Sequence, residues 1–454
     1  MKTELDWSSY RDAGIGDPYA DIPKHGGEFA KAISVCINSE QCKVNTKGVM
    51  CPSYRVNPES RFSTGGRVRL LKAALNGGLG DTPFNDNLLV ETMDLCLACK
   101  GCKRECENEV DMAMIKNEFL AQHYKHNPVP FRSKIFSNLS YYLNYYPASR
   151  ILVKLRNKIP LLPTITQLLI GITAKRQLPV PVKSSFLSEH DETTLFSPSN
   201  KETDKEVVLL IDTFTDNYSP QYATDAISVL NKAGYKVYIT KPNKNIEQSS
   251  RPLCCGRTHI ANGLIEQAKF EASRMLSVLL PHAEAGRSIV GIEPSCLIAI
   301  RDDYLFLGLG KEAEKVASKA ILFEEFIVRE MKANRFKLNF RAINTNNAPL
   351  MVHGHCHQKA VGAMKSMRKL LKHIPDLKFE LIESTCCGMA GSFGIEKEHA
   401  DIAMEMAEQT LLPALRKNPK ARVLTNGFSC SHQIKEGVNR SSIHIATLLR
   451  EAIA

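Results

Sequence analysis

The sequence predicts an α+β protein of several domains, in which a helical, cysteine-bearing domain precedes two duplicated α/β units with parallel sheets. Three observations support this prediction. The chain has 454 residues, too many for one compact core. Its first part shows helical periodicity between clusters of cysteines. Beyond residue 205, strand and helix patterns alternate in the same order twice, and each copy contains a Cys-Cys-Gly sequence.

The expected boundaries follow changes in composition along the chain. The predicted parts are a helical domain at 1–126, a basic connector at 127–204, a first unit at 205–340 and a second unit at 341–454. In the helical domain, the segment GGRVRLLKAALNGG is expected to stop at Gly77 and Gly78. The connector is marked by prolines, basic residues and then serines and threonines.

Each unit reads as strand, helix, strand, Cys-Cys-Gly, helix and a strand that ends in cysteine. Parallel strands present their carboxyl ends at one edge of a sheet, where ligand sites gather. We therefore expect the cysteines of each unit to converge as metal ligands. These are Cys254, Cys255 and Cys296 in the first unit and Cys356, Cys386, Cys387 and Cys430 in the second. The alternative is two buried cysteines followed by an ordinary turn, but packing alone does not explain the same motif at the same place twice.

Composition narrows the class of protein. Hydrophobic residues make up 43% and charged residues 24%, as in a soluble globular protein. The amino terminus has no apolar segment of the kind found in secretory signals, so a cytoplasmic location is expected. Fourteen cysteines in a reducing compartment indicate metal or cluster ligands and not disulfides.

The segment CLACKGCKREC has the C-x2-C-x2-C-x3-C spacing of bacterial-type [4Fe–4S] ferredoxins. Zinc sites usually have CxxC pairs separated by longer loops, which disfavours zinc here. In two-cluster ferredoxins the fourth cysteine of each run binds the other cluster. One expected ligand set is Cys51 with Cys96, Cys99 and Cys102, and the other is Cys36 and Cys42 with Cys106.

The second of these sets has three thiols. In CINSEQCKVNTKGVMCP, Ser39 stands at the midpoint between Cys36 and Cys42, in the place of a ligand. An oxygen ligand, a water or a three-iron cluster would each account for the missing thiol. In HGHCHQ, His353, His355 and His357 alternate along the chain, so they cannot all face one metal ion.

The net charge of +11 arises mainly in one segment. Between Glu118 and Glu189 there is no acidic residue, while ten lysines and arginines lie at 125–183. This segment also contains apolar runs such as ILVKLRNKIPLLPTITQLLIGIT, which suit a membrane surface or an acidic partner. The alternative is a solvated linker that packs its leucines and isoleucines on a neighbouring domain. The longest uncharged run, 16 residues with two prolines, is too short to span a bilayer.

Motifs for nucleotide, flavin or hydrolase sites are absent from the sequence: no G-x-G-x-x-G opens a helix, and neither a Walker loop nor G-x-S-x-G occurs. Few aromatic residues alternate with cations outside the connector, which disfavours nucleic-acid binding. The sequence therefore indicates an electron carrier and identifies no catalytic residue.

The ordered motifs GVMCPSYR, CLACKGCKREC, CCGR, GIEPSC, HGHCHQKA, CCGMAGSFG and SCSHQI resemble the carboxyl-terminal iron–sulfur half of FAD-linked oxidases of the D-2-hydroxyglutarate or D-lactate dehydrogenase kind. They are also similar to glycolate oxidase iron–sulfur subunits, to the iron–sulfur subunit of anaerobic glycerol-3-phosphate dehydrogenase and to heterodisulfide reductase cysteine-rich domains. The resemblance implies an iron–sulfur electron-transfer subunit or domain that passes electrons from FAD on a partner to a quinone or other carrier. The basic and apolar composition of residues 125–183 separately predicts peripheral membrane or quinone contact, at the inner face of the cell membrane.

Two departures from the heterodisulfide reductase pattern bear on the second function considered, a thiol or disulfide reductase acting at the Cys-Cys-Gly sites. No cysteine stands in DTFTDN of the first unit, and Cys430 is not followed by the second cysteine of a CxxC pair. The first unit keeps three thiols and the second keeps four, which leaves room for a third cluster in the second unit and disfavours disulfide reduction.

Overall fold

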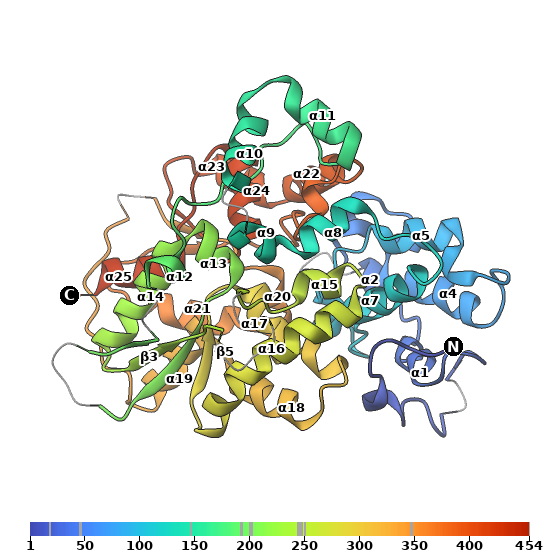
Figure 1. The fold of residues 1–454 in the computed structure, drawn as a ribbon, viewed down its shortest axis with the longest axis horizontal. Coiled ribbons are helices and arrows are strands. Elements are labelled where there is room, and N and C mark those ends of the chain that lie inside the picture. The colour runs from blue at the N-terminus through green and yellow to red at the C-terminus, as the bar shows by residue number, and fades with distance from the viewer. Residues whose placement is uncertain are drawn as a thin grey trace.

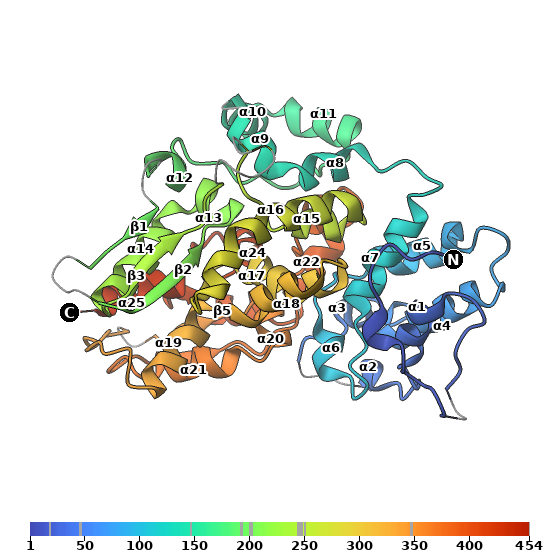
Figure 2. The same ribbon diagram turned by 60° about the horizontal axis from the view of Figure 1, so that its bottom comes forward.

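The computed structural model describes residues 1–17, 20–44, 48–145, 148–190, 194–198, 203–242, 248, 251–345 and 348–453. It is rich in helices and contains two sheets, so the predicted α+β class with parallel sheets is confirmed. The amino-terminal helices lie at one end of the molecule and the sheets toward the other (Figures 1 and 2). A group of helices projects from the body between these ends.

The amino-terminal region is helical, as predicted. Its helices are α1 (Gly27–Ser34), α2 (Gln41–Val44), α3 (Pro52–Val56), α4 (Thr64–Leu75), α5 (Asn87–Asp94), α6 (Gly101–Glu105) and α7 (Met112–His123), with 3-10 turns η1 (Ser8–Tyr10), η2 (Ser60–Phe62) and η3 (Pro83–Asn85). The side chain of Ser63 caps α4 by accepting a hydrogen bond from Gly66 N at 3.0 Å. The helix ends before Gly77, whose φ of +81° is the left-handed conformation expected there.

The segment predicted as a connector is also mostly helical. It contains α8 (Phe131–Ser137), α9 (Leu139–Tyr145), α10 (Ala148–Lys158), α11 (Leu161–Ile170) and α12 (Phe186–Glu189). Helices α10 and α11 form a hairpin at the top of Figure 1, away from the sheets. Among the described residues, no helix has the length and apolar character needed to cross a bilayer.

The first unit is built on a five-stranded sheet with the order β1-β3-β2-β4-β5. Strand β1 pairs antiparallel with β3, and the other pairs are parallel. Its strands are β1 (Leu195–Phe196), β2 (Glu206–Leu210), β3 (Lys236–Ile239), β4 (Ser288–Gly291) and β5 (Ala320–Leu322). Its helices are α13 (Thr213–Tyr218), α14 (Pro220–Lys232), α15 (Arg257–Ala261), α16 (Ile265–Glu284), α17 (Pro294–Arg301), α18 (Gly310–Lys319) and α19 (Phe323–Lys332), with the turn η4 (Asp303–Phe306).

The second unit has a three-stranded parallel sheet with the order β7-β6-β8. Its strands are β6 (Leu350–Val352), β7 (Phe379–Leu381) and β8 (Val423–Leu424). Its helices are α20 (Cys356–Ala360), α21 (Met364–Leu371), α22 (Ala400–Glu408), α23 (Leu411–Lys417), α24 (Phe428–Val438) and α25 (Ile445–Ala452), with the turn η5 (Phe393–Ile395). In both sheets the first strand of the β-α-β order is central, because β2 lies between β3 and β4, and β6 between β7 and β8.

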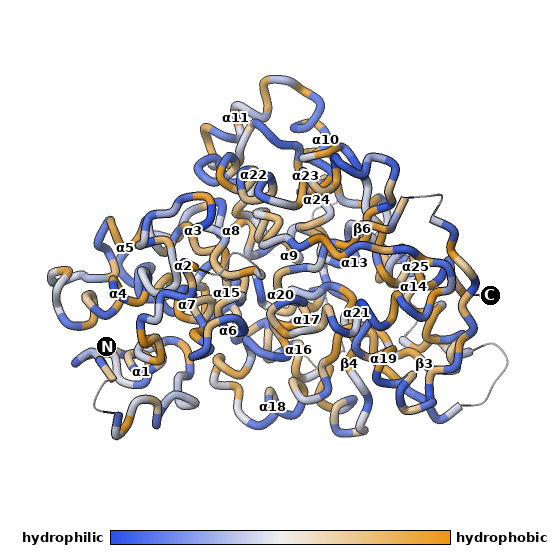
Figure 3. Tube along the Cα trace, turned by 180° about the vertical axis from the view of Figure 1, so that it is seen from behind, coloured by the Kyte–Doolittle hydropathy of each residue, from blue (hydrophilic) through white to orange (hydrophobic). Residues whose placement is uncertain are grey.

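Three hydrophobic clusters hold these parts together, and hydrophobic residues gather around the strands and inner helices in Figure 3. One cluster joins the amino-terminal helices to the first unit, where the ring of Trp7 lies 5.1 Å from that of Phe29 and 5.4 Å from that of Phe306. A second joins the two units, since α25 packs on α14. The metal-ligand candidates therefore lie in a body with shared cores, which fixes their relative positions.

The prediction that strands run up to Cys296, Cys356 and Cys430 was wrong in detail. The strands end at Gly291, Val352 and Leu424, and each cysteine lies in the first turn of the following helix. The physical reason is capping: Glu293 and His355 accept hydrogen bonds from backbone N–H groups at the starts of their helices and so begin them early. The cysteines still lie at the carboxyl edges of the sheets.

Candidate metal centres

The loop from Cys96 to Cys106 is folded tightly between α5 and α7. Ala98 and Lys100 both adopt left-handed backbone conformations, with φ of 48° and 59°. A Cβ at Gly101 would lie 3.1 Å from Met50 N, so the loop packs directly on the backbone of the other cysteine run. The loop and the first cysteine run therefore lie directly against each other.

Cysteines from the two amino-terminal runs lie near one another. Burial raises the pKa of Cys102 well above its usual value, and the thiols of Cys51 and Cys96 contribute to the shift. Burial also raises the pKa of Cys36, against a hydrogen bond from the backbone of Asn38, and its neighbouring thiols are Cys106 and Cys42. Cysteines far apart in the sequence are therefore neighbours, as crossed ligation would require, and the two ligand sets stay a prediction.

A buried cation lies beside the first group. Arg67 is 1% exposed, and its Nη1 is 4.0 Å from Cys51 Sγ. Its other hydrogen bonds go to neutral oxygens of Phe62, Thr92 and Ser53 at 2.6, 2.9 and 2.9 Å. Among the described residues Arg67 forms no ion pair with a carboxylate. A buried guanidinium needs a counter-charge, and thiolates that bind an anionic cluster supply it, so these residues fit an iron–sulfur group.

Ser39 is exposed, between Asn38 and Glu40, which both have φ of 60°. The nearby Cys42 Sγ accepts a hydrogen bond from Gly65 N at 3.4 Å. The role of Ser39 as a ligand stays a prediction. Residues 45–47 of the insertion between Cys42 and Cys51 lie outside the described residues.

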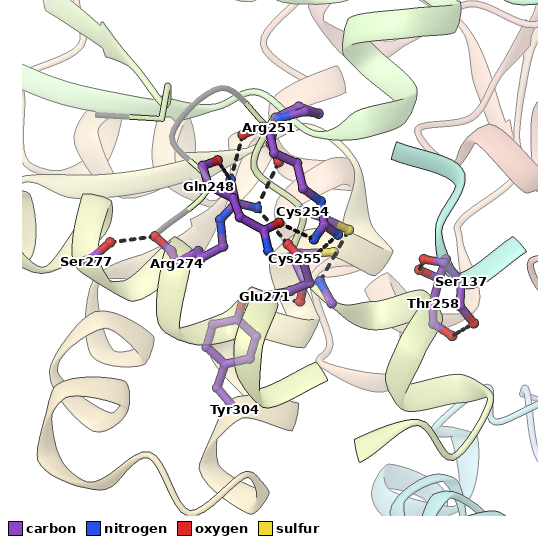
Figure 4. Close-up of polar contacts among 12 residues, drawn as sticks. Ser137, Gln248, Arg251, Cys254, Cys255, Thr258, Glu271, Arg274, Ser277 and Tyr304 are labelled. Carbon is purple, nitrogen blue, oxygen red and sulfur yellow. Dashed lines mark hydrogen bonds and ion pairs between the residues drawn. The ribbon is translucent and has the colours of Figure 1, made fainter. Parts of the chain in front are cut away.

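In the first unit, Cys255 lies between two other thiols. It is in hydrogen-bonding contact with both Cys254 and Cys296, and all three side chains are buried (Figure 4 labels the first two). Gly256 N donates to Cys254 Sγ at 3.5 Å, and Tyr304 Oη donates to the carbonyl oxygen of Cys255 at 3.1 Å. The predicted convergence of these thiols is seen in the structure.

Two carboxylates that sequence reasoning missed lie next to this group. Asp212 follows β2, where the unit lacks a cysteine, and burial together with the charge of Glu293 raises its pKa to about 7. Cys255 lowers the pKa of Cys296 through a hydrogen bond, but burial and the charges of Asp212 and Glu293 raise it to about 12. Glu293 also accepts a hydrogen bond from Phe428 N of the second unit at 2.8 Å. The position of Asp212 directly after a strand was the available signal.

In the second unit, four buried thiols form a chain of contacts in the order Cys356, Cys386, Cys387 and Cys430. The first and last of them are 74 residues apart, and their convergence was predicted from sheet topology. The glycine of the motif is required sterically. Gly388 has φ of +84°, and a Cβ there would lie 2.1 Å from Ala403 O.

The three histidines of HGHCHQ have different contacts. His355 caps α20, because its Nδ1 accepts a hydrogen bond from His357 N at 3.1 Å. His357 Nε2 lies 3.3 Å from Ala98 O of the amino-terminal cysteine loop. His353 follows β6 directly and is 1% exposed.

The amino-terminal cysteine loop contacts both units. Burial raises the pKa of Cys99 well above its usual value, and the charges of Cys356 and Cys386 are the next causes, ahead of Cys102. Lys100 Nζ lies 2.5 Å from Asp302 and 2.6 Å from Asp303 of the first unit. Cys99 is therefore the thiol of the amino-terminal groups that borders the second-unit thiols, a proximity that spacing alone does not predict.

Comparisons with known proteins agree with this architecture. Residues 35–111 match a 4Fe-4S dicluster domain, and residues 350–435 match a cysteine-rich domain. The D-2-hydroxyglutarate dehydrogenase of Pantoea ananatis is 23% identical over 404 residues, which are 87% of this chain and 37% of that protein. That of Escherichia coli K12 is 22% identical over 403 residues, covering 87% and 38% of the two chains.

A subunit of the anaerobic glycerol-3-phosphate dehydrogenase of Escherichia coli K12 is 26% identical over 242 residues, which are 52% of this chain and 57% of that protein. The chain spans less than half the length of the D-2-hydroxyglutarate dehydrogenases that it matches. It therefore combines a 4Fe–4S dicluster domain with a cysteine-rich domain, and over most of its length it is similar to part of the D-2-hydroxyglutarate dehydrogenases.

Proposed function

We propose that the chain is the iron–sulfur component of a flavin-dependent 2-hydroxy-acid dehydrogenase. It takes electrons from FAD on a partner subunit or domain and passes them to a quinone or other carrier. The observation that carries the proposal is the position of Cys99, which packs against the hydrophobic cluster that contains Cys356 and Cys386, next to the contact of Ala98 O with His357. This contact gives the dicluster domain a short route to the second unit. The names of the relatives, which are dehydrogenases and a dehydrogenase subunit, support the same function.

The proposed ligands are Cys51, Cys96, Cys99 and Cys102 for one cluster and Cys36, Cys42 and Cys106, with a further ligand, for the other. When bound, such clusters supply reversible one-electron transfer. The chain buries Cys51 and Cys102, places the charge of Arg67 beside Cys51 and fixes the cysteine loop against the first unit through Lys100. The chain alone is expected to be inactive toward 2-hydroxy acids.

A reoxidation experiment tests this function. The chain is reconstituted anaerobically, reduced with dithionite and mixed with a water-soluble quinone or with an oxidised dithiol. We expect the cluster absorbance to recover with the quinone and to stay bleached with the disulfide. Reoxidation by the disulfide alone, with thiol release, would instead support the alternative function, a thiol or disulfide reductase.

The structure gives that alternative less support. A reactive cysteine needs an accessible thiolate. In the second unit all four thiols are buried, and the pKa of Cys387 is raised well above its usual value by its contact with Cys430 and by burial, although Cys386 lowers it. These are properties of ligands or packed residues and not of nucleophiles.

We also propose that the α10–α11 hairpin attaches the protein to an anionic membrane surface on the cytoplasmic side. Leu161, Leu168 and Leu169 are 72%, 77% and 77% exposed. Ile151 and Leu152 are 58% and 64% exposed, so the expectation that these residues pack on a neighbouring domain is not met. The hairpin projects from the body of the molecule (Figure 1), and exposed apolar side chains on such a projection are typical of an interaction surface.

The positive charge of the α10–α11 hairpin and the hydrogen bonds that fix its base favour a lipid surface as its binding partner. No acidic residue occurs between Glu118 and Glu189 in the sequence. Arg132 and Lys175 pair with Glu398 and Asp401 of the second unit, but among the described residues Lys154 and Lys158 on α10 are in no ion pair, so their charges are available to anionic lipid. The base of the hairpin is fixed: Arg156 donates to the carbonyl oxygen of Arg176 at 2.5 Å, and Lys397 N of the second unit donates to Gly171 O at 2.9 Å. A fixed, exposed amphipathic hairpin matches the interfacial class of membrane contact.

Vesicle sedimentation tests the attachment. The double variant L168Q/L169Q should lose most of the binding to phosphatidylserine vesicles, whereas the control Leu305→Gln, which changes a 44% exposed leucine of the first unit, should bind normally. Unchanged binding in the double variant, or equal binding to neutral vesicles at any salt concentration, would contradict the proposal. If the chain binds an acidic protein and no vesicles, the hairpin is a site for an acidic protein partner and not for a membrane.

We infer, finally, that the two units arose by duplication and that boundaries near residues 126 and 340 separate domains, while the sheet of the first unit extends to β1 before residue 204. The shared position of β2 and β6 at the centre of each sheet supports the duplication.

A further inference from the structure

A cavity lies between the two units, at the carboxyl edges of their sheets. Its volume is about 190 Å³, and residues that follow β2, β4 and β8 line it, among them Phe214, Glu293 and Thr425. Engineered cavities of ~150 Å³ take up benzene, so this space is large enough for one six-membered ring. Gly427 is also in its wall, and a Cβ there would lie 3.3 Å from Cys430 Sγ. The cavity therefore borders the second-unit thiols.

Two polar atoms of the cavity wall have no hydrogen-bond partner among the described residues. Thr425 is 3% exposed, and its Oγ1 is unpaired. His432 Nε2 is unpaired as well, while the ring forms a hydrogen bond with the backbone of Gln177 through its other nitrogen. Buried polar atoms are normally satisfied, so two such atoms in the wall of one cavity indicate a ligand that carries polar groups.

Aromatic rings form a large part of the remaining wall. The rings of Phe214 and Phe428 are stacked, with centroids 4.8 Å apart and planes inclined by 21°. Tyr222 and His444 form a second stacked pair with centroids 4.9 Å apart. All four side chains line the cavity. Aromatic walls with a few polar groups are typical of sites for planar organic ligands.

The charged groups of the cavity favour a neutral ligand. Glu293 is 6% exposed, and its carboxylate already accepts hydrogen bonds from Ser295 Oγ at 2.7 Å and Phe428 N at 2.8 Å. Lys435 lies at the surface, and its Nζ donates to Asn439 Oδ1 at 2.9 Å. An anion such as a 2-hydroxy acid would lie beside a buried carboxylate without a buried cation to pair with it, which is costly.

The cavity also lies next to the base of the α10–α11 hairpin. Pro179 lines it, and the segment 176–182 around this proline connects the two structures. On the hairpin side, Asn157 Nδ2 of α10 donates to Leu178 O at 2.7 Å. On the other side, Val182 N donates to Asn217 O of α13 at 2.8 Å. A lipid-soluble ligand in the cavity is therefore close to the surface that we propose binds the membrane.

We propose that this cavity binds the head group of a lipid-soluble quinone. Thr425 Oγ1 donates a hydrogen bond to a carbonyl oxygen of the quinone, and His432 Nε2 accepts one from a hydroxyl of the quinol. Reduction of the quinone to the quinol takes two electrons, which the reduced chain supplies, and two protons, which come from water. This inference rests on the proposed electron-transfer function and adds to it the class of the acceptor and the place where it binds.

The binding of duroquinone, a tetramethyl quinone without a free ring position for thiol addition, tests the site. Isothermal titration calorimetry is carried out with the full, oxidised chain, so that no electron transfer accompanies binding. We expect Thr425→Val to weaken binding roughly two- to tenfold and T425V/H432F to weaken it by about tenfold or more. The matched control is Thr410→Val, because Thr410 Oγ1 is also buried and unpaired but does not line the cavity. This control should keep the parent's Kd.

An unchanged Kd in both cavity variants, or an equal loss in Thr410→Val, would overturn the proposal. Competition by D-lactate would also overturn it, since the ligand would then be an anion. Thr425→Val decides alone if the double variant does not fold, because it replaces an unpaired hydroxyl by a methyl group of similar size. The two proposals fail separately. Binding in the cavity without reoxidation of the reduced chain contradicts the electron-transfer function, whereas reoxidation that is unaffected in the double variant contradicts the site.

Discussion

Removing the charge of Arg67 should lower the reduction potential of the cluster that Cys51 binds. The change is Arg67→Met, which keeps an unbranched side chain of similar length and deletes the guanidinium. That group lies 4.0 Å from Cys51 Sγ and is 1% exposed, so water does not replace it. Loss of a nearby positive charge makes the addition of an electron less favourable.

The magnitude follows from Coulomb's law. Cluster charge is spread beyond the thiolate, so a separation of about 7 Å at an effective dielectric constant of ~20 gives roughly 2.4 kcal/mol. For one electron this corresponds to a potential lowered by about 100 mV. The carbonyl oxygens of Phe62 and Thr92 also lose their donor, which costs roughly 1–3 kcal/mol of stability.

The assay is a redox titration monitored by low-temperature electron paramagnetic resonance, with circular dichroism to check folding. Arg67→Lys should restore part of the lost reduction potential, because lysine keeps the positive charge but lacks the planar guanidinium and its several hydrogen-bond donors. Arg69→Met is the matched control on the same helix, since Arg69 is 42% exposed and its charge is screened. Unchanged potentials for both clusters in Arg67→Met, or a rise in either, would refute the reasoning.

Three further changes have definite expected outcomes. Gly388→Ala places a Cβ 2.1 Å from Ala403 O at φ of +84° and should lower the free energy of unfolding by roughly 2–5 kcal/mol in denaturant titration. The control Gly391→Ala has open space around its Cβ and should lower it by about 1 kcal/mol. Hydrogen bonds to Asp94 and Glu396 outweigh the effect of burial and raise the pKa of His399 to about 9. Its contribution to the free energy of unfolding should therefore be full below about pH 6.5 and be lost as the pH rises through about 9. In unfolding curves, His399→Gln should flatten this dependence on pH. Ser39→Cys should convert a three-iron signal to a four-iron one or shift a four-iron potential, and identical spectra before and after would place Ser39 outside the coordination shell.

Local patterns were sufficient for much of the fold. The apolar run before Asp212 is β2, and the periodic segment after Gly263 is α16, because burial and periodicity act over short distances. The connector was harder, since prolines at 160 and 163 suggested an irregular chain, yet both lie where a helix tolerates them, at the start of α11.

Contacts between distant parts of the chain were beyond local patterns. Sheet topology was enough to predict that Cys356 and Cys430 meet. The approach of Cys99 to Cys356 depends on how the dicluster domain docks, which depends on side chains such as Lys100 and Asp302 that look like ordinary surface charges in the sequence. Arg67 likewise sits in a periodic helix, and only the structure shows that its partners are neutral and that a thiol lies beside it.

Turnover with and without a flavoprotein tests the central claim most directly. The purified chain, with its cluster absorbance confirmed, is incubated with D-2-hydroxyglutarate, D-lactate or glycolate and a redox dye, first alone and then with an FAD-containing dehydrogenase subunit or domain. The account predicts no dye reduction by the chain alone and substrate-dependent bleaching of the cluster absorbance once the flavoprotein is added. Oxidation of a 2-hydroxy acid by the isolated, flavin-free chain would contradict it.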